Sequence, residues 1–109
     1  MTRVTYTETE VVARVRGLTV TRLRAFVAAE GIRPGEAEGR LVFAEADVAR
    51  VQLLEDLVED FDLDADAAAM VIGLVDQIHG LRRELRRLGE AISAEHEDVR
   101  TRIGGHARR

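Results

Sequence analysis

The stretch GLTVTRLRAFVAAEGIRPGEAEGRLVFAEADV, residues 17–48, decides the predicted fold. Thr19 is placed to cap a helix over residues 20–30, because its hydroxyl can accept a hydrogen bond from a backbone N–H in the first turn. Apolar residues recur on one face of this helix, as expected for a helix packed on a core; they are Val20, Leu23, Phe26 and Val27. Gly31 stands where a C-cap glycine belongs and Pro34 follows, so the helix is expected to end there.

A small hairpin and a further helix are expected next. Residues 32–34 and 40–43 have the composition of short strands, and residues 35–39 between them carry the glycines of a turn. This hairpin would lean on the helices as a wing. The following helix is expected to start near Glu45, and its predicted core stripe is Val48, Val51, Leu54, Leu57, Val58 and Phe61.

Another short helix is expected before this stretch. Thr7 and Glu10 match a capping box, in which a hydroxyl and a carboxylate satisfy backbone donors at the start of a helix. The helix is expected to run to about Arg16 and to end at Gly17. Two helices joined by a glycine-containing turn form a helix-turn-helix. The first part of the chain is therefore predicted to be a mainly α, winged helix-turn-helix head with a small β-hairpin wing.

The last part of the chain carries the most regular pattern. Asp62 or Asp64 is expected to cap a long C-terminal helix. Apolar residues occupy the a and d positions of a heptad repeat over residues 71–92, with Leu at each d position, which predicts a coiled-coil helix. The residues of this seam are Val71, Leu74, Ile78, Leu81, Leu85, Leu88 and Ile92. The next d positions are Glu95 and Arg102, so the seam weakens after residue 92.

A helix with such a seam must bury it, either against the chain's own helices or against a second copy of the chain. Intramolecular packing is expected for Val71 and Leu74. The later seam is flanked by arginines that are too polar for an intramolecular core; they are Arg82, Arg83, Arg86 and Arg87. We therefore predict a homodimer through this helix, with parallel and antiparallel pairing both open.

The composition describes one small domain and excludes several kinds of site. The chain has 109 residues, of which 46% are hydrophobic, enough for one core but not for two. It has no Cys, which excludes disulfides, thiolate catalysis and cysteine-based zinc sites. No apolar run reaches the roughly 20 residues of a membrane span, and no secretion signal opens the chain. A cytoplasmic protein without a membrane partner is expected.

Acidic residues are concentrated in one part of the chain. Residues 41–76 carry ten acids against Arg50 alone, a net charge of −9 in a chain whose total is −4. Two interpretations are open: a solvated acidic face balanced by arginines elsewhere, and a docking surface for a basic partner. The candidate partner-binding residues are Asp56, Glu59, Asp60, Asp62, Asp64 and Asp66.

The sequence offers little for catalysis. Ser93 is the only Ser and lies in the last predicted helix, and the three His form no i, i+4 pair. No glycine-rich phosphate loop occurs. The sequence therefore predicts no enzyme, no catalytic residue, no metal site and no cofactor.

Four short motifs run through the first half of the chain. They are Tyr6-Thr7-x-x-Glu10, Gly17-Leu18-Thr19-Val20-x-x-Leu23-Arg24, Glu30-Gly31-Ile32-x-Pro34 and Arg40-Leu41-Val42-Phe43-x-x-x-Asp47-Val48. In this order they resemble the winged-helix head of the MerR superfamily over residues 4–54. The wing followed by the next helix is the more specific part of the resemblance.

The remainder of the chain resembles one particular group within this superfamily. A link, Phe61-Asp62-Leu63-Asp64, leads into Asp76-Gln77-Ile78-x-x-Leu81-x-x-Glu84-Leu85-x-x-Leu88. This looks like the small MerR-like chaperone modulators of the CbpM type, which implies binding to the J-domain of a DnaJ-like co-chaperone and restraint of its activity. We accordingly predict a head over residues 1–62, a dimerisation helix over 63–103 and a flexible tail over 104–109.

A MerR-family transcriptional regulator that binds DNA is the alternative. It would use arginines of the second helix and the wing, namely Arg22, Arg24, Arg33 and Arg40. MerR regulators usually carry an Arg and a Tyr where this chain has Thr21 and Ala25, and the net negative charge opposes phosphate binding. Sequence-specific DNA binding is therefore predicted to be absent or weak.

Overall fold

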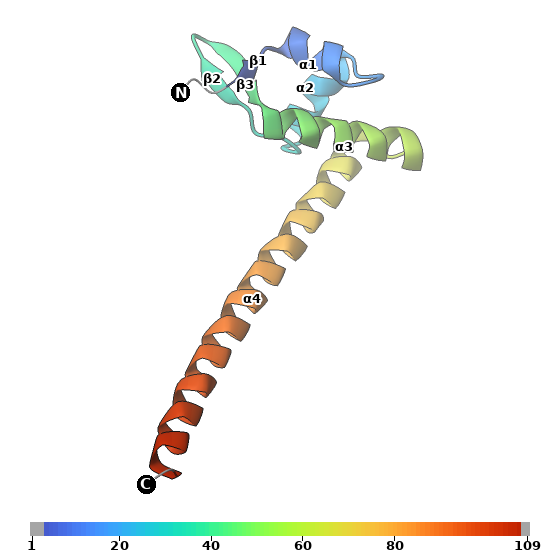
Figure 1. Ribbon diagram of the computed structural model, residues 1–109. Coiled ribbons are helices and arrows are strands. Elements are labelled where there is room, and N and C mark those ends of the chain that lie inside the picture. The colour runs from blue at the N-terminus through green and yellow to red at the C-terminus, as the bar shows by residue number, and fades with distance from the viewer. Residues whose placement is uncertain (1–3, 108–109) are drawn as a thin grey trace. The chain divides into compact units, whose positions relative to one another are not determined.

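The computed structural model describes residues 4–107, with side chains through Arg102, as a mainly helical protein with a small antiparallel sheet and a long C-terminal helix. The elements along the chain (Figure 1) are β1 (Thr5–Tyr6), α1 (Glu8–Arg14), α2 (Val20–Ala28), β2 (Gly35–Ala37), β3 (Arg40–Ala44), α3 (Glu45–Phe61) and α4 (Ala65–Ala107). The chain divides into two compact units, Met1–Leu74 and Val75–Arg109, so the first turns of α4 belong to the first unit.

The predicted start of α1 is confirmed. Thr7 Oγ1 accepts a hydrogen bond from the backbone N–H of Glu10 at 3.2 Å, and Glu10 Oε1 accepts one from the N–H of Thr7 at 3.0 Å. The capping box thus satisfies two donors that the helix itself leaves unpaired. The helix ends at Arg14, slightly earlier than predicted, and Gly17 takes a φ of +80° in the turn that follows.

The predicted N-terminal cap of α2 is also confirmed. The left-handed residue that ends the helix lies one position before the predicted Gly31. Thr19 Oγ1 accepts from the N–H of Arg22 at 3.1 Å. At the other end Glu30, not Gly31, takes the left-handed conformation, with φ 60°. The N–H of Glu30 donates to the carbonyl of Val27 and that of Gly31 to the carbonyl of Phe26, both at 3.0 Å, which is the Schellman pattern.

Gly31 is required for a different reason, which is close packing. A Cβ atom added there would lie 3.1 Å from the Cβ of Ala69 and 3.2 Å from both Cδ atoms of Leu54. The backbone of the loop after α2 therefore passes directly against α3 and the beginning of α4. Gly73 contrasts with it, because a Cβ added at Gly73 meets nothing within 4 Å.

We expect Gly31→Ala to lower the free energy of unfolding by about 1–3 kcal/mol, since the added methyl overpacks the core. Gly73→Ala should instead raise the free energy of unfolding by up to about 1 kcal/mol, because Ala is the better helix former. Urea unfolding followed by circular dichroism, at one protein concentration, measures both. A stability of Gly31→Ala equal to that of the wild type would contradict the packing described here.

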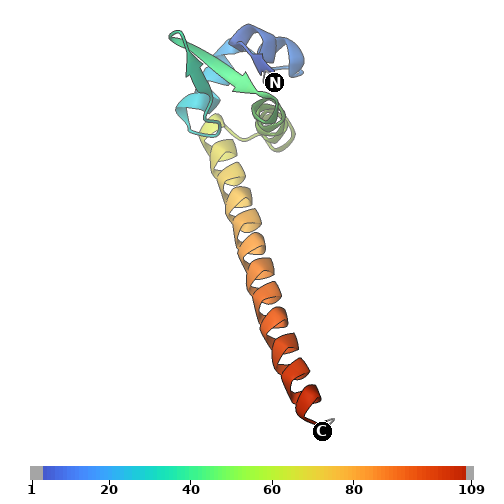
Figure 2. The same ribbon diagram turned by 60° about the vertical axis from the view of Figure 1, so that its left-hand side comes forward.

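The hairpin begins later in the chain than predicted, and its turn is shorter than the predicted turn over residues 35–39. The strand β2 begins only at Gly35 and pairs with β3 in the register Gly35↔Val42 and Ala37↔Arg40. Glu38 and Gly39 form the turn, with φ values of 53° and 75°, as a two-residue turn with both central residues left-handed requires. Figure 2 shows β2 and β3 joined by this turn.

The strand predicted over residues 32–34 is wrong, because this segment supplies core packing instead. Ile32 is 1% exposed and belongs to the buried cluster. A strand that the sequence analysis did not predict, β1, pairs with the other edge of β3 through Tyr6↔Phe43. Within the described residues the sheet order is β1-β3-β2.

The core of the first unit draws on all of its helices. Its buried apolar residues are Tyr6, Val11, Val15, Leu18, Leu23, Phe26, Ile32, Phe43, Val51, Leu54, Ala68 and Ile72. Two predicted core residues are wrong: Val20 is 38% and Phe61 68% exposed. Both lie near the end of a helix, beyond the reach of the elements that cover its centre. Val27, Val48, Leu57 and Val58 are partly buried against the core, as predicted.

The helix α4 begins as predicted and buries a different face from the one expected. Asp64 Oδ1 accepts from the N–H of Ala67 at 2.8 Å and so caps the helix, whereas Asp62 ends α3 in the left-handed conformation, with φ 54°. Ala68 and Ile72 are buried, and Val71 is half-buried. The expected intramolecular packing of Leu74 is wrong, since its side chain is 52% exposed.

In the second unit the seam residues of α4 are exposed. Ile78, Leu81, Leu85, Leu88 and Ile92 are each between 48% and 68% exposed. The backbone is helical through Ala107. The helix thus extends past its predicted end at residue 103 into the predicted tail over 104–109, of which residues 108–109 lie outside the described part of the chain. In the described part, no helix combines the length and the apolar character that crossing a membrane needs.

Candidate partner-binding hollow

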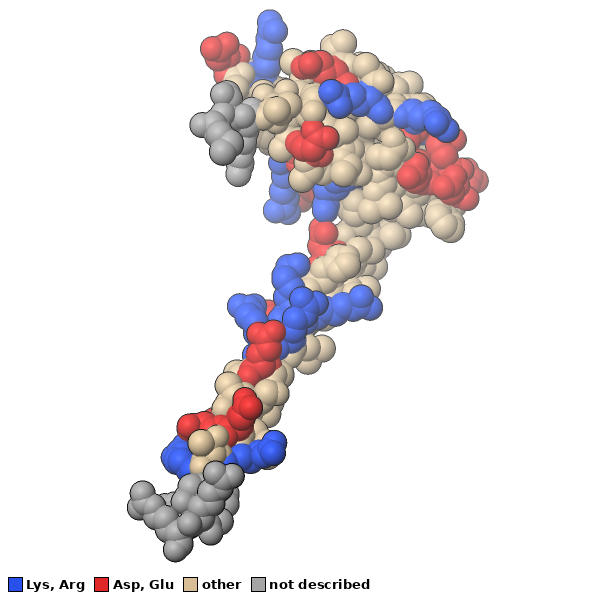
Figure 3. All heavy atoms as spheres, in the orientation of Figure 1, with Lys and Arg blue, Asp and Glu red and all other residues tan. Residues whose placement is uncertain are grey.

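One face of α3 carries a polar stripe. Its residues recur at spacings of three and four and therefore share one side of the helix; they are Gln52, Glu55, Asp56, Glu59 and Asp60. Together with Arg14, Arg16 and Gly17 from the end of α1 and the turn after it, this stripe lines a surface hollow of about 650 Å³. We call it the acidic hollow. Figure 3 shows acidic side chains gathered where α3 ends, with basic side chains next to them.

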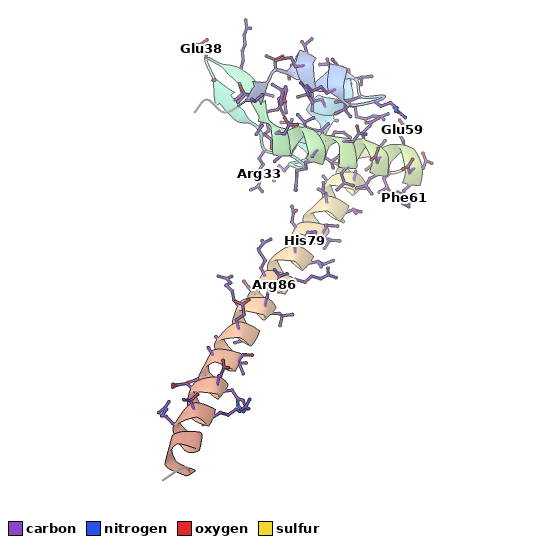
Figure 4. All side chains as sticks on the ribbon, viewed as in Figure 1. Arg33, Glu38, Glu59, Phe61, His79 and Arg86 are labelled. Atoms are coloured by element: carbon purple, nitrogen blue, oxygen red, sulfur yellow. The ribbon has the colours of Figure 1, made fainter. Side chains whose placement is uncertain are left out.

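An arginine of α2 holds two of these carboxylates. Arg22 Nη1 donates to Glu55 Oε1 and to Glu59 Oε1, each at 2.8 Å. The hydrogen bond to Glu59 and the charge of Glu55 raise the pKa of Arg22. This clamp connects α2 to α3 and fixes one side of the acidic hollow. Glu59 remains 60% exposed and is labelled near the end of α3 in Figure 4.

Glu55 is the buried acid of the group. Its side chain is 1% exposed, and its Oε2 has no hydrogen-bond partner among the described residues. Burial raises the pKa of this carboxyl, and the nearby Arg22 only partly offsets that effect. The sequence analysis missed Glu55, because a charged residue within an acidic run reads as one more exposed acid. Its position four residues after Val51, on the same buried face of the helix, was the available signal.

The raised pKa of Glu55 predicts a specific pH dependence of stability. The folded chain binds this proton more tightly than the unfolded chain does. Raising the pH from about 4 through the folded pKa therefore removes stability. Glu55→Gln carries no titrating carboxyl there. The free energy of unfolding of Glu55→Gln minus that of the wild type should therefore increase as the pH rises from about 4 to about 7.

Urea unfolding of both proteins at about pH 4, 5.5 and 7 checks this. A constant difference between the two free energies across that range would mean that the Glu55 carboxyl has the same pKa in the folded and unfolded chains.

The structure divides the six acids that the sequence analysis grouped together. Asp56, Glu59 and Asp60 lie in the acidic hollow. Asp56 Oδ1 accepts from Gln52 Nε2 at 2.9 Å, and both Asp56 and Asp60 are exposed. The other three, Asp62, Asp64 and Asp66, do not line it. Asp64 is used as the cap of α4 and Asp66 lies in the first turn of that helix, where the helix dipole favours an acid.

The basic side of the acidic hollow is built from α1 and its turn. The Arg14 guanidinium lies over the Tyr6 ring, 4.3 Å from its centroid. The Tyr6 hydroxyl in turn donates to Glu45 Oε2, which raises the pKa of Tyr6. Arg16 is exposed. Neither arginine was among the predicted site residues.

The arginines of the DNA-binding alternative do not gather at one place. Arg22 lies in the clamp with Glu55 and Glu59. Arg24 forms an ion pair with Glu8, with Nη2 3.2 Å from Oε2. Arg24 and Arg40 line a second hollow of about 410 Å³, which Arg22 and Arg33 do not line. Two of the four candidate phosphate contacts are therefore already neutralised by carboxylates of the chain.

No protein-family model matches the chain, and no curated protein matches it. Among the described residues, no group of three or more His, Asp or Glu side chains is arranged to hold a metal ion.

Proposed function

We propose that the protein is a chaperone modulator of the CbpM type: a cytoplasmic homodimer that binds the J-domain of a DnaJ-like co-chaperone and restrains its activity. The observation that carries the proposal is the acidic hollow. Asp56 and Asp60 are exposed on α3 and form no ion pair with the cations of the described chain. An acidic surface left open in this way suits a basic partner.

The partner chemistry comes from the family that the sequence resembles. The partner surface of a J-domain centres on a basic helix, as the resemblance implies. A basic helix lying along α3 would meet carboxylates spaced at one turn of a helix. Such charges steer the encounter and set the orientation of the bound helix. Occupation of the basic helix would keep other acidic proteins from binding it, which gives a physical route to restraint of the co-chaperone.

The proposed homodimer rests on the exposed seam of α4. A monomer would leave the five seam residues of the second unit exposed along one helix; they are Ile78, Leu81, Leu85, Leu88 and Ile92. A coiled coil with a second copy would bury them at the a and d positions. The arginines at residues 82, 83, 86 and 87 occupy the e, f, b and c positions, outside the seam, where they stay solvated. Figure 3 shows this basic group on the middle of α4.

The DNA-binding alternative is less well supported. A winged helix-turn-helix head reads DNA with arginines that are free to contact phosphates and bases. Here Arg22 and Arg24 are paired with glutamates of the chain, and the net charge is −4. We propose that a MerR-like head has been kept as a protein-binding module.

Titration calorimetry with the isolated J-domain of a DnaJ-like co-chaperone from the same organism tests the proposal. Saturable binding is expected with the full chain. The same preparation, mixed with DNA duplexes of unrelated sequence at physiological salt, should show no nanomolar complex. A nanomolar complex with one particular duplex would favour the transcriptional regulator instead.

A further inference from the structure

The acidic hollow has a positively charged side that the proposed function does not explain. Arg14 and Arg16 line it opposite the carboxylates of α3. Among the described residues, neither arginine forms an ion pair with Asp56, Glu59 or Asp60. Both kinds of charge therefore line the same open volume of about 650 Å³ without pairing with each other.

Contacts within the fold hold both sides of this hollow in place. On one side, Arg14 is stacked on Tyr6, and the turn that carries Arg16 is set by the positive φ of Gly17. On the other side, Arg22 holds Glu59 at 2.8 Å. The side chains of Arg14 and Glu59, which these contacts hold, lose little conformational freedom when a ligand binds.

The α3 side carries more acids than Arg22 can pair with, and the buried Glu55 adds an oxygen that has no partner in the described chain. Its side chain is 99% buried at the base of the stripe, and Oε2 has no hydrogen-bond partner among the described residues. One guanidinium, that of Arg22, serves both Glu55 and Glu59. A further cation would therefore be stabilised beside α3, and an anion would be stabilised beside Arg14 and Arg16.

We propose that the acidic hollow binds a segment of the partner protein that carries both charges. A Lys or Arg of the segment faces Asp56 and Asp60, and an Asp or Glu faces Arg14 and Arg16. This inference rests on the proposed function and deepens it, because it assigns Arg14 and Arg16 to recognition and requires an acidic side chain on the partner. Two opposite charge contacts also fix the direction in which the segment lies.

The double variant Arg14→Gln, Arg16→Gln separates this inference from a purely acidic docking surface. If the hollow binds both charges, affinity for the J-domain should fall by at least about fivefold, because the acidic side chain of the partner loses its counterions. A purely acidic surface predicts the opposite sign, since removal of two positive charges strengthens the attraction for a basic helix. Calorimetry with the full chain and the isolated J-domain measures the difference. Unchanged or tighter binding overturns the inference.

Two further variants control for net charge and for folding. Arg33→Gln with Arg40→Gln removes the same charge from residues that do not line the hollow, and it should not weaken binding. Arg16→Gln alone leaves the contact of Arg14 with Tyr6 intact and should still weaken binding. Equal weakening by the Arg33/Arg40 pair would overturn the inference. A wild type that does not bind the J-domain would overturn the proposed function itself, an outcome distinct from a wild type that binds and is indifferent to Arg14 and Arg16.

Discussion

Replacing Leu85 by arginine converts the proposed homodimer into a monomer. Leu85 lies in the middle of the seam on α4 and is 68% exposed in the single chain. In a coiled coil this position is an a site, so the added guanidinium group of each chain would lie in an apolar environment. A buried charge without a partner costs several kcal/mol, which is enough to dissociate a dimer of ordinary affinity.

Sedimentation velocity at micromolar concentration checks this expectation. The wild type should sediment with about twice the chain mass of 12.1 kDa and Leu85→Arg with the mass of one chain. Ser93→Arg is the matched control: it adds the same charge on the same helix at an exposed b position, outside the seam, and should leave the dimer intact. A wild type with the mass of one chain would contradict the dimer.

Reversing two charges of the acidic hollow should abolish most of the binding to the J-domain. Asp56→Arg combined with Asp60→Arg replaces the two exposed carboxylates on α3 with groups that repel a basic helix. We expect at least about a tenfold loss of affinity, equivalent to about 1.4 kcal/mol, measured by calorimetry. Asp64 is left unchanged because its carboxylate caps α4, and its loss would cost about 1 kcal/mol of stability.

The control pair for this variant is Glu36→Arg with Glu97→Arg. Both residues are exposed and lie outside the acidic hollow, and the change in net charge is the same. The control should bind the J-domain with little change, while helical content stays at the wild-type level in both variants. Equal losses in the two variants would mean that net charge, and not the hollow, governs binding.

The features predicted correctly from sequence are those decided by residues close together along the chain. The caps at Thr7, Thr19 and Asp64 each join a side chain to a backbone N–H three residues on. Such hydrogen bonds depend on local geometry alone. The start of α3 at Glu45 is likewise marked by acids in the first turn. The sequence therefore predicted where the helices begin more closely than where they end.

The errors concern contacts between distant segments. The pairing of Tyr6 with Phe43 joins residues far apart in sequence, and no turn signal connects them. Ile32 was predicted to lie in a strand from the composition of residues 32–43, yet its side chain packs in the core. Phe61 fits the apolar period of α3, but the elements that cover the helix do not reach its last residue. Periodicity identifies the apolar face of a helix, but it does not identify the segment that packs against that face.

The part of the site that lies on one helix was predictable from sequence, and the part that depends on contacts between segments was not. The acidic run in the chain placed Asp56, Glu59 and Asp60 among the candidates, and the helical period brings them to one face. The burial of Glu55 and the approach of Arg14 and Arg16 depend on how the turn after α1 meets α3. Neither is encoded in the local sequence. Asp62 and Asp64 were predicted to belong to the site because of their charge. In the structure Asp62 ends α3 and Asp64 caps α4.

Titration of the full-length wild type with the J-domain, at low and at high salt, tests the central claim most directly. Saturable binding of one J-domain per chain is expected, with a Kd of about 1 μM or tighter. Binding should weaken clearly between about 0.1 M and 1 M salt, because the exposed carboxylates of the acidic hollow are screened over that range. Absence of binding at J-domain concentrations of about 100 μM, or an affinity indifferent to salt, would contradict it.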